Sequence, residues 1–131
     1  MKVIEVVAAI IHKDEVYLAT QKGYGEFEDM WEFPGGKIEP EETSEAALIR
    51  EIQEELGVDI SIDKFLCTIN YDYPTFHLVM HCYLCSIVSG RLELKEHKSA
   101  RWLNMKTLNS IEWLPADKPI VDKLLQYSKK S

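Results

Sequence analysis

Hydrophobic positions along the chain follow two different periods, and the shorter one predicts strands. Residues 4–12 and 16–20 are rich in β-branched and apolar side chains, and the polar Lys13-Asp14-Glu15 between them is typical of a hairpin turn. A short extended segment at residues 31–33 is ended by Pro34-Gly35-Gly36, because proline and glycine interrupt regular strands. Three later stretches also predict strands: residues 65–71, 77–88 and 100–104.

The longer period predicts two helices. Residues 44–56 carry an apolar stripe made of Leu48, Ile49, Ile52 and Leu56. Thr43 is placed to cap the N-terminus of this helix, and Gly57 is a good residue to end it. A last helix is expected over residues 116–127. This order of strands and helices predicts an α/β fold, with a mixed β-sheet between helices.

The composition fits one soluble domain. A chain of 131 residues can bury one hydrophobic core, so we expect a single domain over residues 1–131. Apolar residues make up 46% and charged residues 28%, which is ordinary for a globular protein. No apolar run approaches the roughly 20 residues that cross a bilayer, and Glu5 interrupts the apolar N-terminal stretch of a would-be signal peptide. We therefore expect a cytoplasmic protein with no membrane partner.

Cysteine content and charge narrow the partners further. The three cysteines, Cys67, Cys82 and Cys85, lack the spacing of a secreted scaffold, which favours free thiols in a reducing compartment. A formal net charge of −7 argues against a nucleic-acid polymer as partner. It is compatible with a small phosphorylated ligand when a divalent cation lies between the negative groups. Net charge alone also fits a role in solubility only.

The first predicted helix carries a cluster of acids. Glu51, Glu54 and Glu55 stand at positions i, i+3 and i+4, so their carboxylates fall within roughly a third of the helix circumference. Like charges at this spacing destabilise a helix, whereas Mg²⁺ prefers carboxylate oxygens and would reverse the effect. Arg50 beside them can hold a carboxylate through a bidentate bond. The spacing by itself also fits a solvated acidic face.

Residues 36–58 together resemble the Nudix box. The match consists of Gly36, five residues, Glu42, seven residues, and then Arg50-Glu51-Ile52-Gln53-Glu54-Glu55-Leu56-Gly57-Val58. The lead-in from Trp31 to Glu39 and the segment Leu114-Pro115-Ala116-Asp117-Lys118-Pro119 resemble the MutT branch of this family. The resemblance implies a Nudix α/β/α sandwich that hydrolyses nucleoside triphosphates to the monophosphate and pyrophosphate.

The resemblance also implies the metal site. Glu51, Glu54 and Glu55 would bind Mg²⁺, for which Mn²⁺ can substitute, and the Gly35 carbonyl and Glu96 would be further ligands. Arg50 and Glu42 would support the catalytic helix and its carboxylates. Glu51 is our choice for the base that accepts a proton from the attacking water. For Glu96, a solvated loop glutamate is an equally good interpretation.

Substrate recognition is expected from residues outside the acidic helix. Phe33 is a candidate for packing against a nucleobase, or else an ordinary core aromatic, and Asp117 is a candidate for reading the base, or else the N-cap of the last helix. An aspartate accepts hydrogen bonds, which leaves both an oxidised guanine and a cytosine open as the base. Contacts to the phosphates are expected from Gln21, Lys22, Gly36 and Lys37.

The expected function is hydrolysis of a damaged or non-standard nucleotide such as 8-oxo-dGTP. Three alternatives remain open: a pyrophosphohydrolase for CTP or a modified dCTP, a hydrolase of another nucleoside diphosphate derivative, and a catalytically silent domain that senses a nucleotide. The expected partner is a small-molecule nucleotide, and the protein is expected to be a monomer or homodimer.

Overall fold

The computed structural model describes residues 1–129, over which the chain forms one mixed sheet and two helices. The strands are β1 (Lys2–Lys13), β2 (Val16–Lys22), β3 (Trp31–Glu32), β4 (Gly35–Lys37), β5 (Val58–Tyr73), β6 (Phe76–Gly90) and β7 (His97–Leu103). The helices are α1 (Ser44–Leu56) and α2 (Lys118–Lys129). The predicted α/β class is confirmed.

Strand β1 lies at the centre of the sheet. The strand order is β3-β2-β1-β6-β5, with β4 paired to β1 and β7 paired to β2. The β1–β6 pair is parallel, and the other pairs are antiparallel. A two-residue turn joins β1 to β2, and in it Asp14 takes the left-handed conformation (φ 56°).

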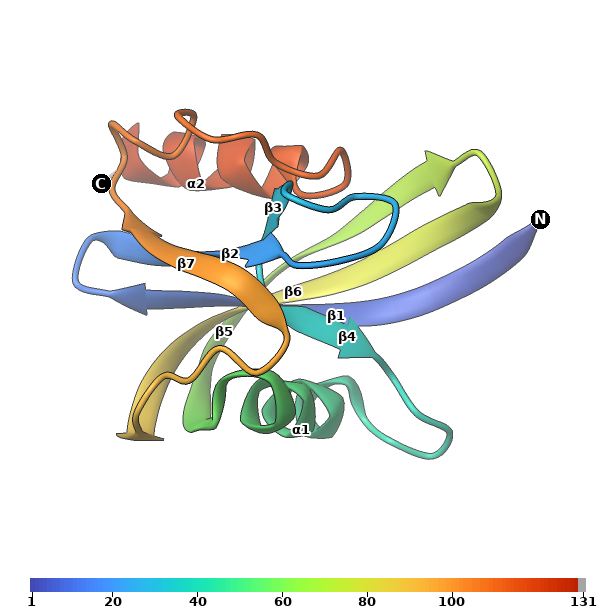
Figure 1. Cartoon of the computed structure of the whole chain (residues 1–131), viewed down its shortest axis with the longest axis horizontal. Helices are drawn as coiled ribbons and strands as arrows, with labels where there is room; N and C mark the ends of the chain where they lie inside the picture. Colours follow the sequence, from blue (N-terminus) through green and yellow to red (C-terminus); the bar gives the residue numbers. More distant parts are fainter. Residues whose placement is uncertain (130–131) are drawn as a thin grey trace.

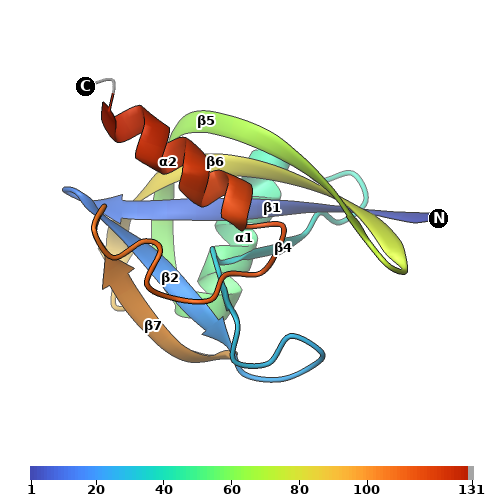
Figure 2. The same ribbon diagram turned by 90° about the horizontal axis from the view of Figure 1, so that it is seen from above.

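The two helices cover opposite faces of the sheet (Figure 1), and α2 crosses over the strands when the molecule is seen from above (Figure 2). Side chains of β1 alternate between the two layers, because successive residues of a strand point to opposite faces. Val7, Ala9 and Ile11 pack in the cluster that includes α1, whereas Ala8 and Ile10 pack in the cluster that includes α2. The sheet therefore has a hydrophobic core on each face.

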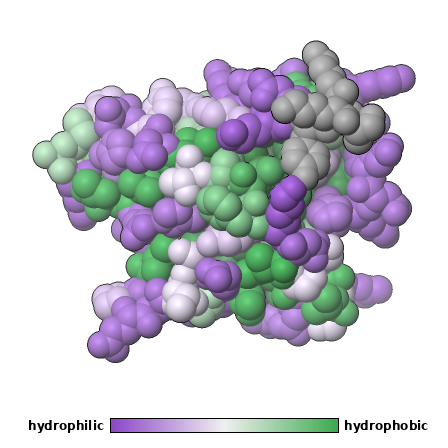
Figure 3. Space-filling model, turned by 180° about the vertical axis from the view of Figure 1, so that it is seen from behind, coloured by the Kyte–Doolittle hydropathy of each residue, from purple (hydrophilic) through white to green (hydrophobic). Residues whose placement is uncertain are grey.

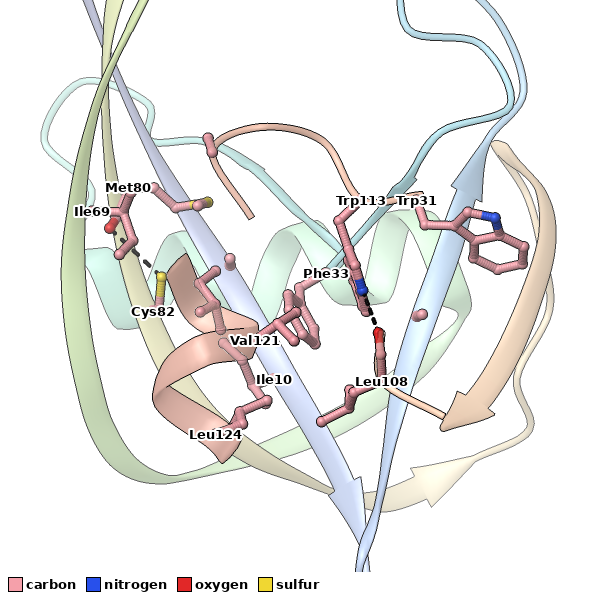
Figure 4. Packing of buried hydrophobic residues seen from close by; sticks show 14 of the residues in the cluster. Ile10, Trp31, Phe33, Ile69, Met80, Cys82, Leu108, Trp113, Val121 and Leu124 are labelled. Atoms are coloured by element: carbon pink, nitrogen blue, oxygen red, sulfur yellow. Dashed lines mark hydrogen bonds between the residues drawn. The ribbon is translucent and has the colours of Figure 1, made fainter. Parts of the chain in front are cut away.

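Aromatic residues fill the core beneath α2 (Figure 4). The rings of Phe33 and Trp113 stack with their centroids 4.5 Å apart, and Trp113 Nε1 donates to the Leu108 carbonyl at 2.6 Å. Val121 and Leu124 of α2 pack in the same core.

Helix α1 has the bounds that the sequence predicts, and its caps explain them. The Thr43 hydroxyl accepts the Ala46 N–H at 3.1 Å, which satisfies one free donor of the first turn. Gly57 takes a left-handed conformation (φ 69°), and its N–H donates to the Gln53 carbonyl at 3.0 Å. The predicted stripe is buried except at Ile49, which is 42% exposed.

Several predicted bounds were too short. Strand β5 extends well beyond 65–71, because bulges between Asp59 and Ile60 and at two later points interrupt the two-residue period, whereas β6 exceeds 77–88 by only one residue at its start and two at its end. Strand β4 was read as a turn, because two of its three residues are glycines. Helix α2 begins at Lys118 rather than at residue 116.

The surface is mixed in character. Seen from behind, hydrophobic residues are interspersed among hydrophilic ones (Figure 3). Cys67, Cys82 and Cys85 are free and buried, as expected. Neither helix within residues 1–129 has the length and apolar character needed to cross a membrane.

Candidate active site

A cleft of about 300 Å³ lies at the edge where β1, β4 and β6 meet the loops before β3 and β7. One end is acidic and carries three carboxylates: Glu32, Glu55 and Glu96. The other end is largely apolar and is lined by Phe27, Tyr73, Phe76, Leu78, Met80 and Leu114. Such a lining can hold a flat apolar group at one end and, with a divalent cation beside the carboxylates, an anionic group at the other.

Glu55 is the carboxylate that α1 buries at the acidic end. The residue is 6% exposed, and its Oε2 atom has no hydrogen-bond partner among the described residues. Burial, followed by the negative charges of Glu32, Glu51 and Glu96, raises the pKa of Glu55 to about 9. A cation placed here would offset that rise, because a nearby positive charge favours the ionised carboxylate.

Arg50 binds one acid of the loop before α1 and two further acids of the helix. Its Nε and Nη2 atoms donate to the two carboxylate oxygens of Glu42 at 2.7 and 2.9 Å, and this pairing lowers the pKa of Glu42 to about 2. Its Nη1 atom donates to Glu51 at 2.9 Å and to Glu54 at 3.3 Å. Nη2 also donates to the Lys37 carbonyl at 3.1 Å, so one guanidinium joins β4, the loop and the helix.

Strand β4 brings Gly35 and Gly36 against β1 and α1. A Cβ atom on Gly35 would overlap the Val7 carbonyl, and a Cβ atom on Gly36 would overlap the Glu51 carboxylate. Only glycine allows the close approach to the backbone at Gly35, whereas a side chain at Gly36 would require the Glu51 carboxylate to shift. The missing side chain at Gly36 thus leaves the space that the Glu51 carboxylate occupies.

The donors at the acidic end fit a hard divalent cation. Carboxylate and carbonyl oxygens are the ligands that such cations prefer. The unpartnered Glu55 Oε2 and the space beside Gly36 are features that a cation and its ligands would use. Among the residues that the structure describes, no three His, Cys, Asp or Glu side chains are already gathered as a metal site. Glu51 and Glu54 are instead bonded to Arg50, which directs their carboxylates to the guanidinium.

Glu96 and the predicted lysines also reach the cleft. Glu96 lines it from the loop before β7, close enough to Glu55 to influence its pKa. Lys22 lines the cleft with its Nζ 3.9 Å from Glu32 Oε2, and Gly36 and Lys37 line it from β4.

Gln21 is not among the residues that line the cleft. Its amide donates to the Asp29 carbonyl at 2.9 Å. The register of β2 and β7 shifts between Gln21 and Lys22, and of the two residues only Lys22 lines the cleft. The contact to phosphate expected of Gln21 therefore finds no support in this arrangement.

Phe33 and Asp117 meet at the apolar end. Phe33 is 3% exposed, so its ring is first a core residue, although the residue lines the cleft. Its backbone N–H donates to Asp117 Oδ2 at 2.8 Å. Asp117 is 4% exposed, and burial followed by the charge of Glu32 raises the pKa of its carboxyl well above the ordinary range. It directly precedes α2, as the N-cap interpretation expects, and it lines the cleft, while its reading of a base stays a prediction.

Sequence reasoning missed several residues of the cleft. His97 is a buried ring with its Nε2 atom 3.2 Å from Glu32 Oε2. Glu32 was placed in the family lead-in without a role. Leu78 and Met80 lie two residues apart on β6, which indicates one shared face but not which ligand it meets.

Comparisons with known proteins agree with this geometry. A family model described as NUDIX domain matches residues 1–124. The chain is 32% identical over 123 residues to the CTP pyrophosphohydrolase of Escherichia coli (strain K12), covering 93% of this chain and 91% of that protein. It is 30% identical over 126 residues to the 8-oxo-dGTP diphosphatase of the same organism, covering 95% and 98%. The solution structure of the E. coli ORF135 protein superposes with a TM-score of 0.86 at 30% identity, covering 99% of this chain and 94% of that one. The chain therefore belongs to the Nudix hydrolase family.

Proposed function

We propose that this protein is a Mg²⁺-dependent pyrophosphohydrolase that converts a nucleoside triphosphate and water into the monophosphate and pyrophosphate. The observation that carries the proposal is the single cleft that joins carboxylates at one end to an aromatic, apolar end with Asp117. Nudix hydrolases act on small nucleotides and use a divalent metal ion. The cleft offers a place for each part of such a substrate.

The proposed metal site lies at the acidic end and extends to Glu51 and Glu54, which follow on α1 outside the lining of the cleft. Side chains of Glu51, Glu54, Glu55 and Glu96 and the Gly35 carbonyl would hold the ion. When bound, Mg²⁺ supplies charge neutralisation of the triphosphate and polarises the attacking water. Glu51 would accept the proton of that water, and Arg50, anchored by Glu42, would keep the Glu51 carboxylate in place.

The remaining lining would bind the rest of the nucleotide. Lys22, Lys37 and the Gly36 backbone lie where phosphates would meet them, and Gln21 stays a weaker candidate because it lies outside the lining. The apolar end would bury the base, with Phe33 supporting its floor from the core. Asp117 would bond the edge of the base.

The two relatives named above point to different bases. One is named for CTP and the other for 8-oxo-dGTP, at 32% and 30% identity. We place a damaged or non-standard triphosphate such as 8-oxo-dGTP first, and CTP or a modified dCTP second. Asp117 is compatible with both, because a carboxylate can accept from an exocyclic amine or a ring N–H.

A nucleotide panel tests the proposal. The purified protein with Mg²⁺ is offered dGTP, 8-oxo-dGTP, CTP, dCTP, 5-substituted dCTPs and ADP-ribose, and products are resolved by chromatography, with Glu54→Gln as the control. Turnover of one triphosphate far ahead of the others, lost in the variant, supports the proposal and identifies the base. Hydrolysis of ADP-ribose alone would move the substrate to other nucleoside diphosphate derivatives. Metal binding without any turnover would favour a nucleotide sensor.

A further inference from the structure

His97 is a buried imidazole that the proposed reaction does not yet use. Its side chain is only 6% exposed, although an imidazole ring is polar and readily hydrated. It opens strand β7 directly after Glu96 and pairs with Lys22 of β2. The register of the two strands shifts at this point, and such irregularities often re-aim side chains beside active sites.

The ring lies between two of the carboxylates of the cleft. Its Nε2 atom is 3.2 Å from Glu32 Oε2, which is a hydrogen bond, and 3.9 Å from Glu55 Oε2, which is too long for one. The two carboxylates come from different elements, β3 and α1. The imidazole is thus bonded to the edge of the sheet at Glu32 and lies beside the Glu55 carboxylate of the acidic helix.

Two buried polar atoms at this place have no partner among the described residues: Glu55 Oε2 and His97 Nδ1. Unpartnered buried polar atoms are rare, because losing hydration without gaining a hydrogen bond is costly. Both residues also line the cleft. Packing requirements alone do not explain why a histidine, rather than an apolar residue, lies against two acids here.

We infer that His97 is a positioning residue for the divalent-ion site: its ring holds the Glu32 carboxylate beside that of Glu55, while its backbone sets where Glu96 enters the cleft. The inference rests on the proposed function, because it assigns His97 to the metal site of that hydrolysis. His97 contacts carboxylates and not the nucleotide. Hydrogen-bonded neighbours of metal ligands commonly change metal affinity by tenfold or more when they are replaced.

Binding of Mn²⁺ to metal-free protein, followed by electron paramagnetic resonance, tests the inference without any turnover. His97→Leu keeps much of the volume and removes the donor, whereas His97→Gln can place an amide N–H near the position of Nε2. We expect His97→Leu to weaken Mn²⁺ binding by about tenfold or more, and His97→Gln to restore most of the affinity. Lys98→Gln, at the neighbouring exposed lysine, is the matched control and should bind as the wild type does.

Thermal unfolding of the metal-free variants separates positioning from stability. If both His97 variants melt earlier but the folded proteins bind Mn²⁺ as the wild type does, His97 is structural only and the inference is overturned. If the wild type binds no Mn²⁺, the metal site and the inference fail together. If the wild type binds Mn²⁺ in a His97-dependent way yet hydrolyses no nucleotide, only the proposed function fails.

Discussion

Arg50 and Glu42 form a bidentate pair, with Nε to Oε2 at 2.7 Å and Nη2 to Oε1 at 2.9 Å. The loop that precedes α1 is thereby tied to the helix. The remaining Nη1 atom is free to direct Glu51 and Glu54 toward one side. The arrangement makes the geometry of the acidic helix depend on one planar guanidinium.

Replacement of Arg50 by lysine should therefore impair the site even though the charge is kept. A lysine cannot form two parallel bonds to Glu42 and still reach Glu51, because its ammonium is a single point donor. We expect kcat/KM to fall by about tenfold or more and the melting temperature to drop. Enzyme kinetics and thermal unfolding measure both effects.

Arg91→Lys is the matched control for that variant. Arg91 is exposed and lies outside the cleft, so its replacement should leave both quantities unchanged. Equal activity of Arg50→Lys and wild type would contradict the role given to the bidentate pair.

Replacement by alanine should have different effects at the two glycines of β4. A Cβ atom on Gly36 meets only the Glu51 side chain, which can move, whereas a Cβ atom on Gly35 meets the backbone of β1, which cannot. We expect Gly36→Ala to fold but to lose Mn²⁺ affinity and turnover, and Gly35→Ala to be strongly destabilised. Thermal unfolding and Mn²⁺ binding distinguish the two. A fully active Gly36→Ala protein would show that the position of Glu51 is unimportant.

Glu55 should make the stability of the metal-free protein depend on pH. Its pKa rises from 4.5 to about 9 on folding, so between these values the folded protein keeps a proton that the unfolded chain has lost. The contribution of Glu55 to the free energy of unfolding should therefore be largest below pH 4.5. It should fall as the pH rises toward 9.

Urea unfolding in EDTA across this pH range measures that dependence. Glu55→Gln removes the titrating group, so its curve should be flatter than that of the wild type. In the wild type, Mg²⁺ should bind more tightly as pH rises, because the ligand must lose its proton. Parallel curves for the two proteins would mean that Glu55 keeps its ordinary pKa.

Asp117 should govern the choice of base rather than the metal chemistry. Asp117→Asn keeps an oxygen that can accept from the Phe33 N–H, but it adds an amide donor at the cleft. We expect the ranking of kcat/KM among nucleotides to change while Mn²⁺ affinity stays the same. Asp117→Leu serves as the contrast: it leaves the buried Phe33 N–H unpaired and should cost about 1–3 kcal/mol of stability. An unchanged ranking in Asp117→Asn would remove Asp117 from base recognition.

The acidic helix could be predicted from the sequence because its information is local. Thr43, the stripe ending at Leu56 and Gly57 each indicate a feature of α1, and the structure confirms its bounds. The long strands could not be bounded in the same way. In β5, residues such as Asp59 and Asp63 are exposed and bulges interrupt the alternation, so the first part of this strand shows no clear strand pattern.

The cleft itself depends on contacts between distant segments. His97 and Glu32 lie 65 residues apart, and only the pairing of β2 with both β3 and β7 brings them together. The Phe33–Asp117 bond likewise joins residues 84 apart. A single sequence carries no direct signal for such pairs, whereas the family resemblance indicated Glu96 and Asp117 through their position in a motif. That residues 1–131 form one domain stays a prediction.

The products of a single turnover test the central claim most directly. The preferred triphosphate is mixed with excess protein and Mg²⁺, and pyrophosphate and orthophosphate are quantified separately, with Glu55→Gln alongside. The account predicts one pyrophosphate and one monophosphate per nucleotide, with the rate lowered by about a hundredfold or more in the variant. Release of orthophosphate with a nucleoside diphosphate, or an unimpaired Glu55→Gln protein, would contradict it.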